Sequence, residues 1–333
     1  MNFGQINNWL LVGGEDLIVE TALILKECNQ NVHIFTGDRN LAELLKNGQT
    51  LEANLIANKI DFCVSQDINS DDSINRFIDE TTILLSLSSP WIFKSEFIKK
   101  FGKRIINLHE ANLPRNRGGA TLSWMIMMDL KSSGSVLHFV TPGIDEGDIV
   151  LKAEYDFPDS CRLPEDYSRF IFSKSMSLIQ TFIDHAIAGN GFTIFQQDNE
   201  ISTYWPRLNT ELQGFIDWDW RVDYLEKFIR SFDRPYGGSR CFLNGEKVIL
   251  KDARVYDFDD FHPFQRGLIF RKSQEELYIA ANGGALLVRD IRRLNGDKIY
   301  KNVKLGDRLH TPREKLEAAL LMRPVYSSRG IEQ

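Results

Sequence analysis

Residues 9–37 read WLLVGGEDLIVETALILKECNQNVHIFTG, and this stretch decides the fold. Short apolar runs at 9–12 and 32–36 flank a longer stretch, Leu17 to Lys26, whose apolar residues recur with helical spacing. A strand, a helix and a second strand in this order predict a parallel pair of strands with a crossover helix. Gly13-Gly14 does not complete the G-x-G-x-x-G pattern of dinucleotide sites, so it predicts a tight turn between strand and helix.

The same alternation continues to about residue 200 and predicts the N-terminal domain. We expect a mostly parallel sheet covered on both faces, an α/β fold of the doubly wound, Rossmann-like type, over residues 1–200. The further strands are expected at 62–64, 82–87, 105–109 and 136–140, and the helices near 41–57, 72–79, 119–131 and 164–188.

A smaller domain is expected after a linker and one helix at 201–237. Short β-rich runs in this region are separated by the turn signals Asn244-Gly245, Asn282-Gly283-Gly284 and Asn295-Gly296-Asp297. They predict a mainly β, OB-like barrel over residues 238–320. The apolar residues that share one face of the preceding helix are Val222, Leu225, Phe228, Ile229 and Phe232.

Composition and charge narrow the class of protein. The 333 residues are 43% hydrophobic and 26% charged, which excludes wholesale disorder. The net charge of −6 offers no basic field for a phosphate backbone, so no nucleic acid partner is expected. The first residues lack a signal region and no apolar run approaches about 18 residues, so we expect no membrane contact and a cytoplasmic location. The scattered cysteines predict reduced thiols, since they lack the C-x-x-C spacing of zinc or redox sites: Cys28, Cys63, Cys161 and Cys241.

Three polar residues between positions 105 and 149 are suited to acyl transfer. Asn107 and His109 are two residues apart on one expected strand, so both side chains can reach the same reacting atom. The amide can donate to a developing oxyanion, and the imidazole can donate to it or take a proton. Asp145, on the glycine-flanked loop 143–147, is the candidate carboxylate that fixes the His tautomer. His138 competes with His109, and we interpret it as supporting or packing.

The order of these motifs resembles the folate-dependent formyltransferase family. The chain carries N-x-H at 107–109, L-P-x-x-R-G at 113–118, a Trp at 124, G-x-x-x-H at 134–138 and G-x-D-x-G at 143–147. It is most similar to sugar-nucleotide N-formyltransferases, and methionyl-tRNA formyltransferase is the related two-domain member. The similarity continues through Tyr204-Trp205-Pro206-Arg207, 228–236 and 283–288. It departs at Glu110-Ala111, where Pro-Ser is common in relatives, which affects the acceptor side of the pocket.

The resemblance implies transfer of a formyl group from 10-formyltetrahydrofolate to an amine, with no metal and no covalent enzyme intermediate. The catalytic residues would be Asn107, His109 and Asp145. The donor would lie against Ser86, Leu87, Ser88, Trp91, Ile92, Val140, Gly143 and Ile144. The candidate acceptor-binding residues are Arg115 and Arg117, whose guanidinium groups suit a diphosphate, together with Gly118 and Trp205.

The expected acceptor is a small molecule, a nucleotide-linked amino sugar. The preferred hypothesis is that this acceptor is a dTDP-4-amino-4,6-dideoxyhexose used in surface-polysaccharide (lipopolysaccharide) biosynthesis. Two alternatives stay open: formylation of methionyl-tRNA, and a non-catalytic Rossmann-like binding protein in which the three polar residues are scaffold. A homodimer is a further possibility.

Overall fold

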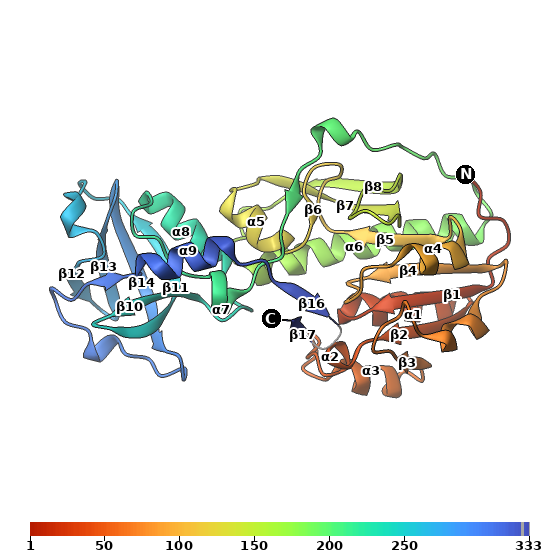
Figure 1. Cartoon of the computed structure of the whole chain (residues 1–333), viewed down its shortest axis with the longest axis horizontal. Helices are drawn as coiled ribbons and strands as arrows, with labels where there is room; N and C mark the ends of the chain where they lie inside the picture. The colour runs from red at the N-terminus through yellow and green to blue at the C-terminus, as the bar shows by residue number, and fades with distance from the viewer. Residues whose placement is uncertain (328–329, 333) are drawn as a thin grey trace.

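The N-terminal domain is built on a seven-stranded sheet. The computed structural model describes residues 1–327 and 330–332. The sheet has the order β3-β2-β1-β4-β5-β7-β8, in which the pairs from β3 to β5 are parallel and β7 and β8 are antiparallel (Figure 1). Its strands are β1 (Asn8–Gly13), β2 (Asn31–Thr36), β3 (Phe62–Val64), β4 (Thr82–Leu87), β5 (Ile105–His109), β7 (Ser132–Phe139) and β8 (Ile149–Asp156).

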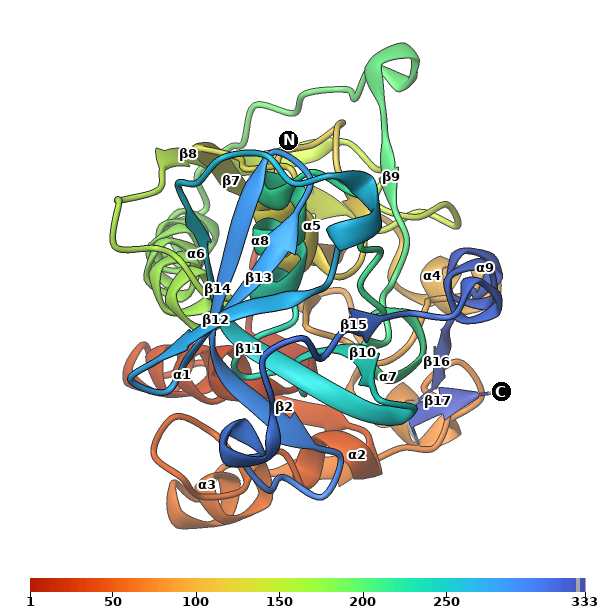
Figure 2. The same ribbon diagram turned by 90° about the vertical axis from the view of Figure 1, so that its left-hand side faces the viewer.

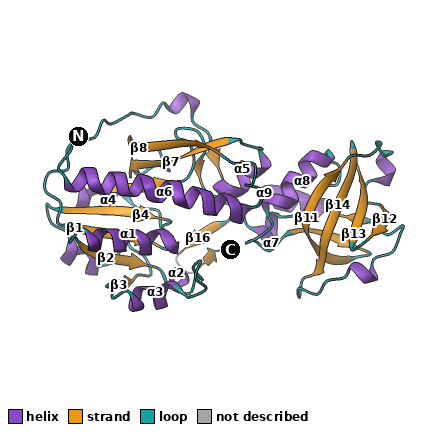
Figure 3. Ribbon diagram, turned by 180° about the vertical axis from the view of Figure 1, so that it is seen from behind, coloured by secondary structure: helices purple, strands orange, loops and turns teal. Residues whose placement is uncertain are grey.

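Helices cover both faces of this sheet, which confirms the doubly wound fold. One face packs against α1, α3 and α6, and the other against α4 and η1. Figure 3 shows α1 and α6 lying along the sheet from behind. The helical elements of this part are α1 (Glu15–Glu27), α2 (Asp38–Leu41), α3 (Leu51–Ala57), η1 (Asp72–Phe77), α4 (Ser95–Phe101), α5 (Thr121–Met127), α6 (Pro164–Ile187) and η2 (Asn199–Ile201).

The structure corrects three expected helices and adds elements that the sequence did not predict. The helix expected near 41–57 is two helices, α2 and α3, because the turn at Gly48 adopts a φ of 78°. The helix expected at 119–131 ends at Met127, ahead of Asp129 with its φ of 52°, and the helix expected at 72–79 is a 3-10 turn. The sequence did not predict β8 or α4.

The predicted tight turn after β1 requires glycine at position 13. Its φ is 145°, and a Cβ there would lie 1.7 Å from the carbonyl oxygen of Leu87. The next amide, Gly14 N–H, donates to that same oxygen at 3.1 Å. The ends of β1 and β4 are therefore joined directly, at the edge where ligands bind in doubly wound folds.

A long connection after α6 returns to the N-terminal domain. It runs over the molecule and comes back as β9 (Tyr204–Trp205), which pairs in parallel with β6 (Arg117–Gly118) (Figures 1 and 2). The amide of Gly119 donates to the carbonyl of Trp205 at 2.9 Å, and that of Arg117 to Thr203 at 3.0 Å. Residues 203–205 thus hold the loop that follows β5.

The C-terminal domain is a curled antiparallel sheet of order β12-β13-β14-β11-β10-β15, as the turn signals predicted. An antiparallel bridge between Leu268 and Arg308 joins its two edges and closes the barrel. At the β10–β11 hairpin, Asn244 and Gly245 both have positive φ. The strands are β10 (Ser239–Leu243), β11 (Glu246–Tyr256), β12 (Ile269–Ser273), β13 (Glu276–Ala281), β14 (Gly284–Arg293) and β15 (Leu309–His310).

The helices of the second half connect the two domains, which lie side by side along the longest axis (Figure 1). The predicted apolar face of α8 is buried against the barrel, and Ser123 of α5 donates to the carbonyl of Ser231 at 2.9 Å. A cavity of about 810 Å³ lies at this junction, lined by α5, α8 and α9. The remaining elements are α7 (Thr210–Gln213), α8 (Val222–Ser231), η3 (Pro263–Gln265), η4 (Tyr300–Asn302), α9 (Arg313–Leu321), β16 (Val325–Ser327) and β17 (Gly330–Glu332).

Within residues 1–327 and 330–332, no helix combines the length and the apolar character needed to cross a bilayer.

Candidate active site

The three predicted catalytic side chains converge at the carboxyl end of β5. Asn107 and His109 extend from the same side of this strand, and Asp145 reaches them from the loop between β7 and β8. Nδ1 of His109 lies 3.5 Å from Oδ2 of Asp145, and Nδ2 of Asn107 lies 3.5 Å from Oδ1. Residues separated by up to 38 positions therefore form one buried cluster of an amide, an imidazole and a carboxylate.

His109 forms a hydrogen bond through one ring nitrogen and faces a carboxylate with the other. Its Nε2 lies 2.8 Å from the carbonyl oxygen of Asn116, which can only accept, so Nε2 carries a proton. Nδ1 then faces Asp145. Burial lowers the pKa of His109 below its ordinary value, and the charge of Asp145 opposes this effect. Burial thus favours the neutral ring, and the neighbouring carboxylate favours the imidazolium form.

Asp145 is kept ionised although it is mostly buried. Burial alone would raise the pKa of Asp145, but His109, His138 and the amide of Gly118 together hold it well below its ordinary value. The Gly118 N–H donates to Oδ2 at 2.9 Å. Asp145 itself has a φ of 49°, an uncommon conformation for a residue with a side chain. This loop is thus held in a specific geometry that presents the carboxylate to both histidines.

His138 contacts two of the three predicted catalytic residues. It stands opposite Asn107 in the β5–β7 register. Its Nδ1 donates to the carbonyl of Phe139 at 2.9 Å, so in the neutral ring Nε2 accepts from the Asn107 amide at 3.1 Å. Nε2 also lies 3.4 Å from Asp145. His138 is about 2% exposed, and its supporting role stays an interpretation.

The predicted donor-binding residues line two loops beside this cluster. Ser86 is paired with Asn107 across β4 and β5, and its buried hydroxyl has no hydrogen-bond partner among the described residues. Ile92 and Ile144 are 66% and 44% exposed, one on each loop. Trp91 is buried and donates to the carbonyl of Gln66 at 3.2 Å. The others are buried Leu87, Ser88 with a φ of 55°, and the partly buried Val140 and Gly143.

The four predicted acceptor-binding residues lie in different environments. Arg117 is buried, and its guanidinium donates to Gln197 and Asn199. Arg115 is exposed, and within the described part of the chain its guanidinium has no hydrogen-bond or ion-pair partner. Gly118 approaches Asp145 through its amide. The indole of Trp205 is packed in an apolar cluster with Met125 and Tyr167. Arg115 is therefore the guanidinium available to an anion, and the substrate contacts of all four stay predictions.

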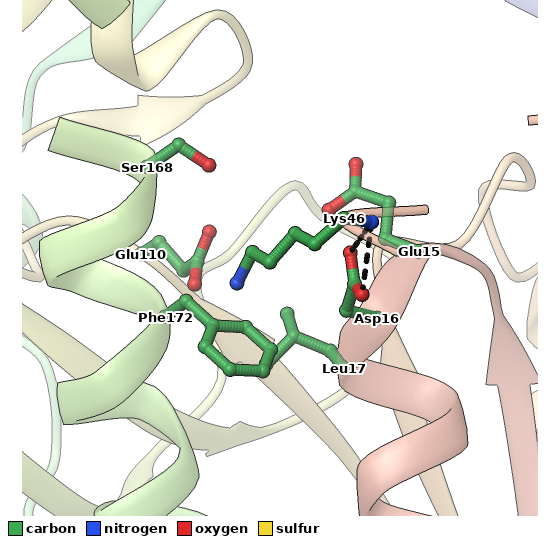
Figure 4. Close-up of a pocket in the computed structure, with 7 residues that line it drawn as sticks. All are labelled: Glu15, Asp16, Leu17, Lys46, Glu110, Ser168 and Phe172. Carbon is green, nitrogen blue, oxygen red and sulfur yellow. Dashed lines mark hydrogen bonds between the residues drawn. The ribbon is translucent and has the colours of Figure 1, made fainter. Parts of the chain in front are cut away.

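A second, smaller pocket lies on the other face of β5. It has a volume of about 40 Å³ and is lined by Glu15, Asp16, Leu17, Lys46, Glu110, Ser168 and Phe172. Figure 4 shows the Lys46 side chain extending from Asp16 toward Glu110. Glu110 accepts from the hydroxyl of Ser175 at 2.8 Å, and burial raises the pKa of its carboxyl. Glu110, which stands where relatives commonly have Pro, thus faces away from His109 and into a pocket lined by three acidic residues.

Comparison with known proteins assigns the family. A family profile described as "Formyl transferase" matches residues 77–161, and one described as "Formyl transferase, C-terminal domain" matches residues 209–303. Together these matches cover more than half of the chain. The chain belongs to the formyltransferase family.

Proteins similar to this formyltransferase include curated relatives and solved structures. Methionyl-tRNA formyltransferase of Clostridium tetani is 26% identical over 220 residues, which cover 62% of this chain and 68% of that protein. An N-formyltransferase from Helicobacter canadensis, solved with folinic acid and dTDP-3-aminofucose, has a TM-score of 0.64 at 18% identity and covers 85% of this chain and 98% of that one. A 4-N formyltransferase from Francisella tularensis has a TM-score of 0.60 at 20% identity and covers 75% and 98%. The structural likeness shows a shared fold.

Gln197 is a residue of the candidate site that the sequence did not indicate. Gln197 is buried, and it contacts both Arg117 and the backbone of the Asp145 loop. In the sequence, Gln197 lies between two polar residues, Gln196 and Asp198, which are exposed in the structure. Such a polar run is typical of a surface linker, so nothing in it indicated a buried side chain. Across the described residues, no group of three His, Cys, Asp or Glu side chains is placed to hold a metal ion.

Proposed function

We propose that this enzyme transfers the formyl group of 10-formyltetrahydrofolate to the amine of a nucleotide-linked amino sugar. The observation that carries this proposal is the convergence of Asn107, His109 and Asp145 at the ligand-binding edge of the sheet. An amide donor, a neutral imidazole and an ionised carboxylate are the groups that acyl transfer to an amine requires.

The residues around this cluster fit the folate donor. Two exposed aliphatic side chains, Ile92 and Ile144, flank the site and suit the faces of a pterin ring. The unpartnered hydroxyl of Ser86 lies beside Asn107 and can bond a polar atom of the ligand. When bound, the donor supplies an activated formyl carbon for attack by an amine.

The protein's own groups then act on charge and protons. One N–H of the Asn107 amide stays with His138, and the other, which faces Asp145 at 3.5 Å, turns toward the carbonyl oxygen on which negative charge develops. His109 takes the proton that the attacking amine loses, which makes it an imidazolium. Asp145, 3.5 Å away and already ionised, stabilises that cation. Because Nε2 donates to the Asn116 carbonyl in the present structure, it can take the amine proton only after the ring proton has moved to Nδ1, which faces Asp145. His109 then returns a proton to N10 of the donor as the bond between N10 and the formyl carbon breaks, and tetrahydrofolate leaves.

The acceptor is proposed from charge and from the relatives. Arg115 offers an exposed guanidinium on the loop after β5, where a diphosphate can be bound in bidentate fashion. The structure from Helicobacter canadensis contains dTDP-3-aminofucose. We therefore propose a dTDP-linked amino-dideoxyhexose, with the 4-amino sugar of surface-polysaccharide biosynthesis as the preferred acceptor.

Methionyl-tRNA is the second candidate acceptor, because the relative from Clostridium tetani acts on it by name. The charge of the whole chain, −6, argues against it, and the barrel carries only a small positive excess. Residues 238–321 hold 16 Lys and Arg against 12 Asp and Glu, and several of these arginines are paired internally. Arg289, Arg292 and Arg293 each form an ion pair with a carboxylate. Such paired charges leave a weak field for a phosphate backbone.

A mass-spectrometric formylation assay tests the proposal. The protein is incubated with 10-formyltetrahydrofolate and either a panel of 3-amino and 4-amino sugar nucleotides or charged initiator tRNA. The expected result is a mass gain of one formyl group on a dTDP-amino sugar. Product on tRNA alone would move the function to the second candidate. No product from any acceptor would leave the proposed function without support.

A further inference from the structure

The segment after α6 contributes a side chain to the catalytic loop. Phe195 forms an antiparallel bridge with Ile149 at the start of β8, with backbone hydrogen bonds of 2.8 and 2.9 Å. This bridge fixes the chain just before Gln197, whose side chain is 6% exposed. Gln197 therefore enters the protein at a defined place next to the loop that carries Asp145.

Every hydrogen-bonding position of the Gln197 side chain is used. Its Nε2 donates to the carbonyl oxygens of Asp145 at 2.9 Å and Gly147 at 2.6 Å. Its Oε1 accepts from Nε and Nη2 of Arg117 at 3.2 and 2.8 Å. An amide has two donor protons and two acceptor lone pairs, so this one is fully satisfied.

These contacts close a ring around the catalytic carboxylate. The Arg117 side chain holds Gln197, Gln197 holds the backbone of Asp145, and the amide of Gly118 holds the Asp145 carboxylate. The backbone of Asp145 is in the left-handed region, which side chains adopt at an energetic cost. Gly147 is packed so tightly that a Cβ would lie 1.9 Å from the Phe139 carbonyl. The backbone of this loop is therefore fixed by tight packing at Gly147 and by the hydrogen bonds of Gln197.

We propose that Gln197, oriented by Arg117, is a positioning residue that sets the carboxylate of Asp145 at its working distance from His109. This inference rests on the proposed function, because it assumes that Asp145 takes part in formyl transfer. A misplacement of about 1 Å in a catalytic group is enough to lower a rate about 100-fold. Because Arg117 is buried and its guanidinium binds Gln197, Arg117 acts on the Asp145 loop through Gln197 and not by direct contact with the acceptor.

The test compares three variants with the wild type. Gln197→Glu keeps the size of the side chain and can still accept from Arg117, but it cannot donate to the two carbonyls. Gln197→Met removes all four hydrogen bonds. Gln196→Glu makes the same chemical change one residue earlier, on an exposed side chain, and serves as the matched control. For each variant, kcat, the KM of both substrates and the melting temperature are measured on the acceptor that the wild type formylates.

The expected result is a fall in kcat of about 10- to 100-fold for both Gln197 variants, with each KM within about twofold and the control unchanged. A kcat equal to that of the wild type in folded Gln197→Glu would overturn the inference. A change confined to KM, or unfolding of both Gln197 variants, would also overturn it, because Gln197 would then serve binding or the fold. Failure of the proposed function is distinguishable, since the wild type itself would then form no product.

Discussion

Replacing Asp145 with Asn tests the central pair of the site. The change removes one negative charge and keeps an oxygen that can accept from the Gly118 amide, which now approaches at 2.9 Å. At the 3.5 Å between Nδ1 of His109 and Oδ2 of Asp145, opposite charges attract by about 5 kcal/mol at an effective dielectric constant of about 20. Loss of this attraction when His109 becomes protonated should lower kcat by about 10³-fold.

The same variant should change the pH dependence of the reaction. The charge of Asp145 raises the pKa of His109, so its removal lowers that pKa further below the ordinary value. Because neutral His109 accepts the proton, the acidic limb of the kcat profile should move to lower pH in the variant. The KM values should change little.

Initial rates of sugar-nucleotide formylation, followed by mass spectrometry from pH 5 to 9, measure both effects. Asp148→Asn is the control, since Asp148 lies on the same loop and its side chain has no hydrogen bond or ion pair among the described residues. A kcat within about threefold of the wild type, in an Asp145→Asn protein with an unchanged melting temperature, would refute the role of the pair.

Three further changes have defined outcomes. Gly147→Ala places a Cβ 1.9 Å from the Phe139 carbonyl and should cost about 2 kcal/mol or more in unfolding free energy, measured by denaturant titration; an unchanged midpoint would contradict this packing. Glu110→Gln should stabilise the protein at pH 8 and hardly at pH 4, because burial raises the pKa of Glu110 and wild-type stability falls as pH rises from about 4 through that raised value. Equal stabilities at pH 8 would exclude this. Arg115→Ala should raise the KM of a nucleotide-sugar acceptor about tenfold, at unchanged kcat; an unaltered KM would remove Arg115 from acceptor binding.

The sequence predicted the parts of the fold that repeat a simple period. The strands at 82–87 and 105–109 match β4 and β5, because buried parallel strands are continuous apolar runs bounded by turns. The turns predicted at 13–14 and 244–245 are also confirmed. Gly13 and Gly245 have positive φ, and a Cβ on Gly13 would clash with the backbone. The strand β8 was not predicted, because its exposed Lys152 and Glu154 interrupt the apolar run of an edge strand.

The site was predicted as far as its chemistry lies in local motifs. Asn107, His109 and Asp145 follow from strand spacing, a glycine-flanked loop and a family resemblance, and the structure brings them together. Arg117 and Gln197 illustrate what local patterns leave out. An arginine beside two glycines resembles a phosphate-binding loop, and only the return of the chain through residues 195–205 shows that its guanidinium is buried. Pairing between segments so far apart leaves no periodic pattern of residues in the sequence, so it could not be predicted.

The return of the chain as β9 sets the smallest fragment that can retain an ordered active site. A fragment that stops after α6 would include all three catalytic residues and the complete seven-stranded sheet. It would lack Gln197, together with the backbone partners of Arg117 and Gly119 at Thr203 and Trp205. A fragment with an ordered candidate site must therefore extend beyond residue 205. In a chimera that exchanges the barrel with that of a relative, the junction should lie after Pro206.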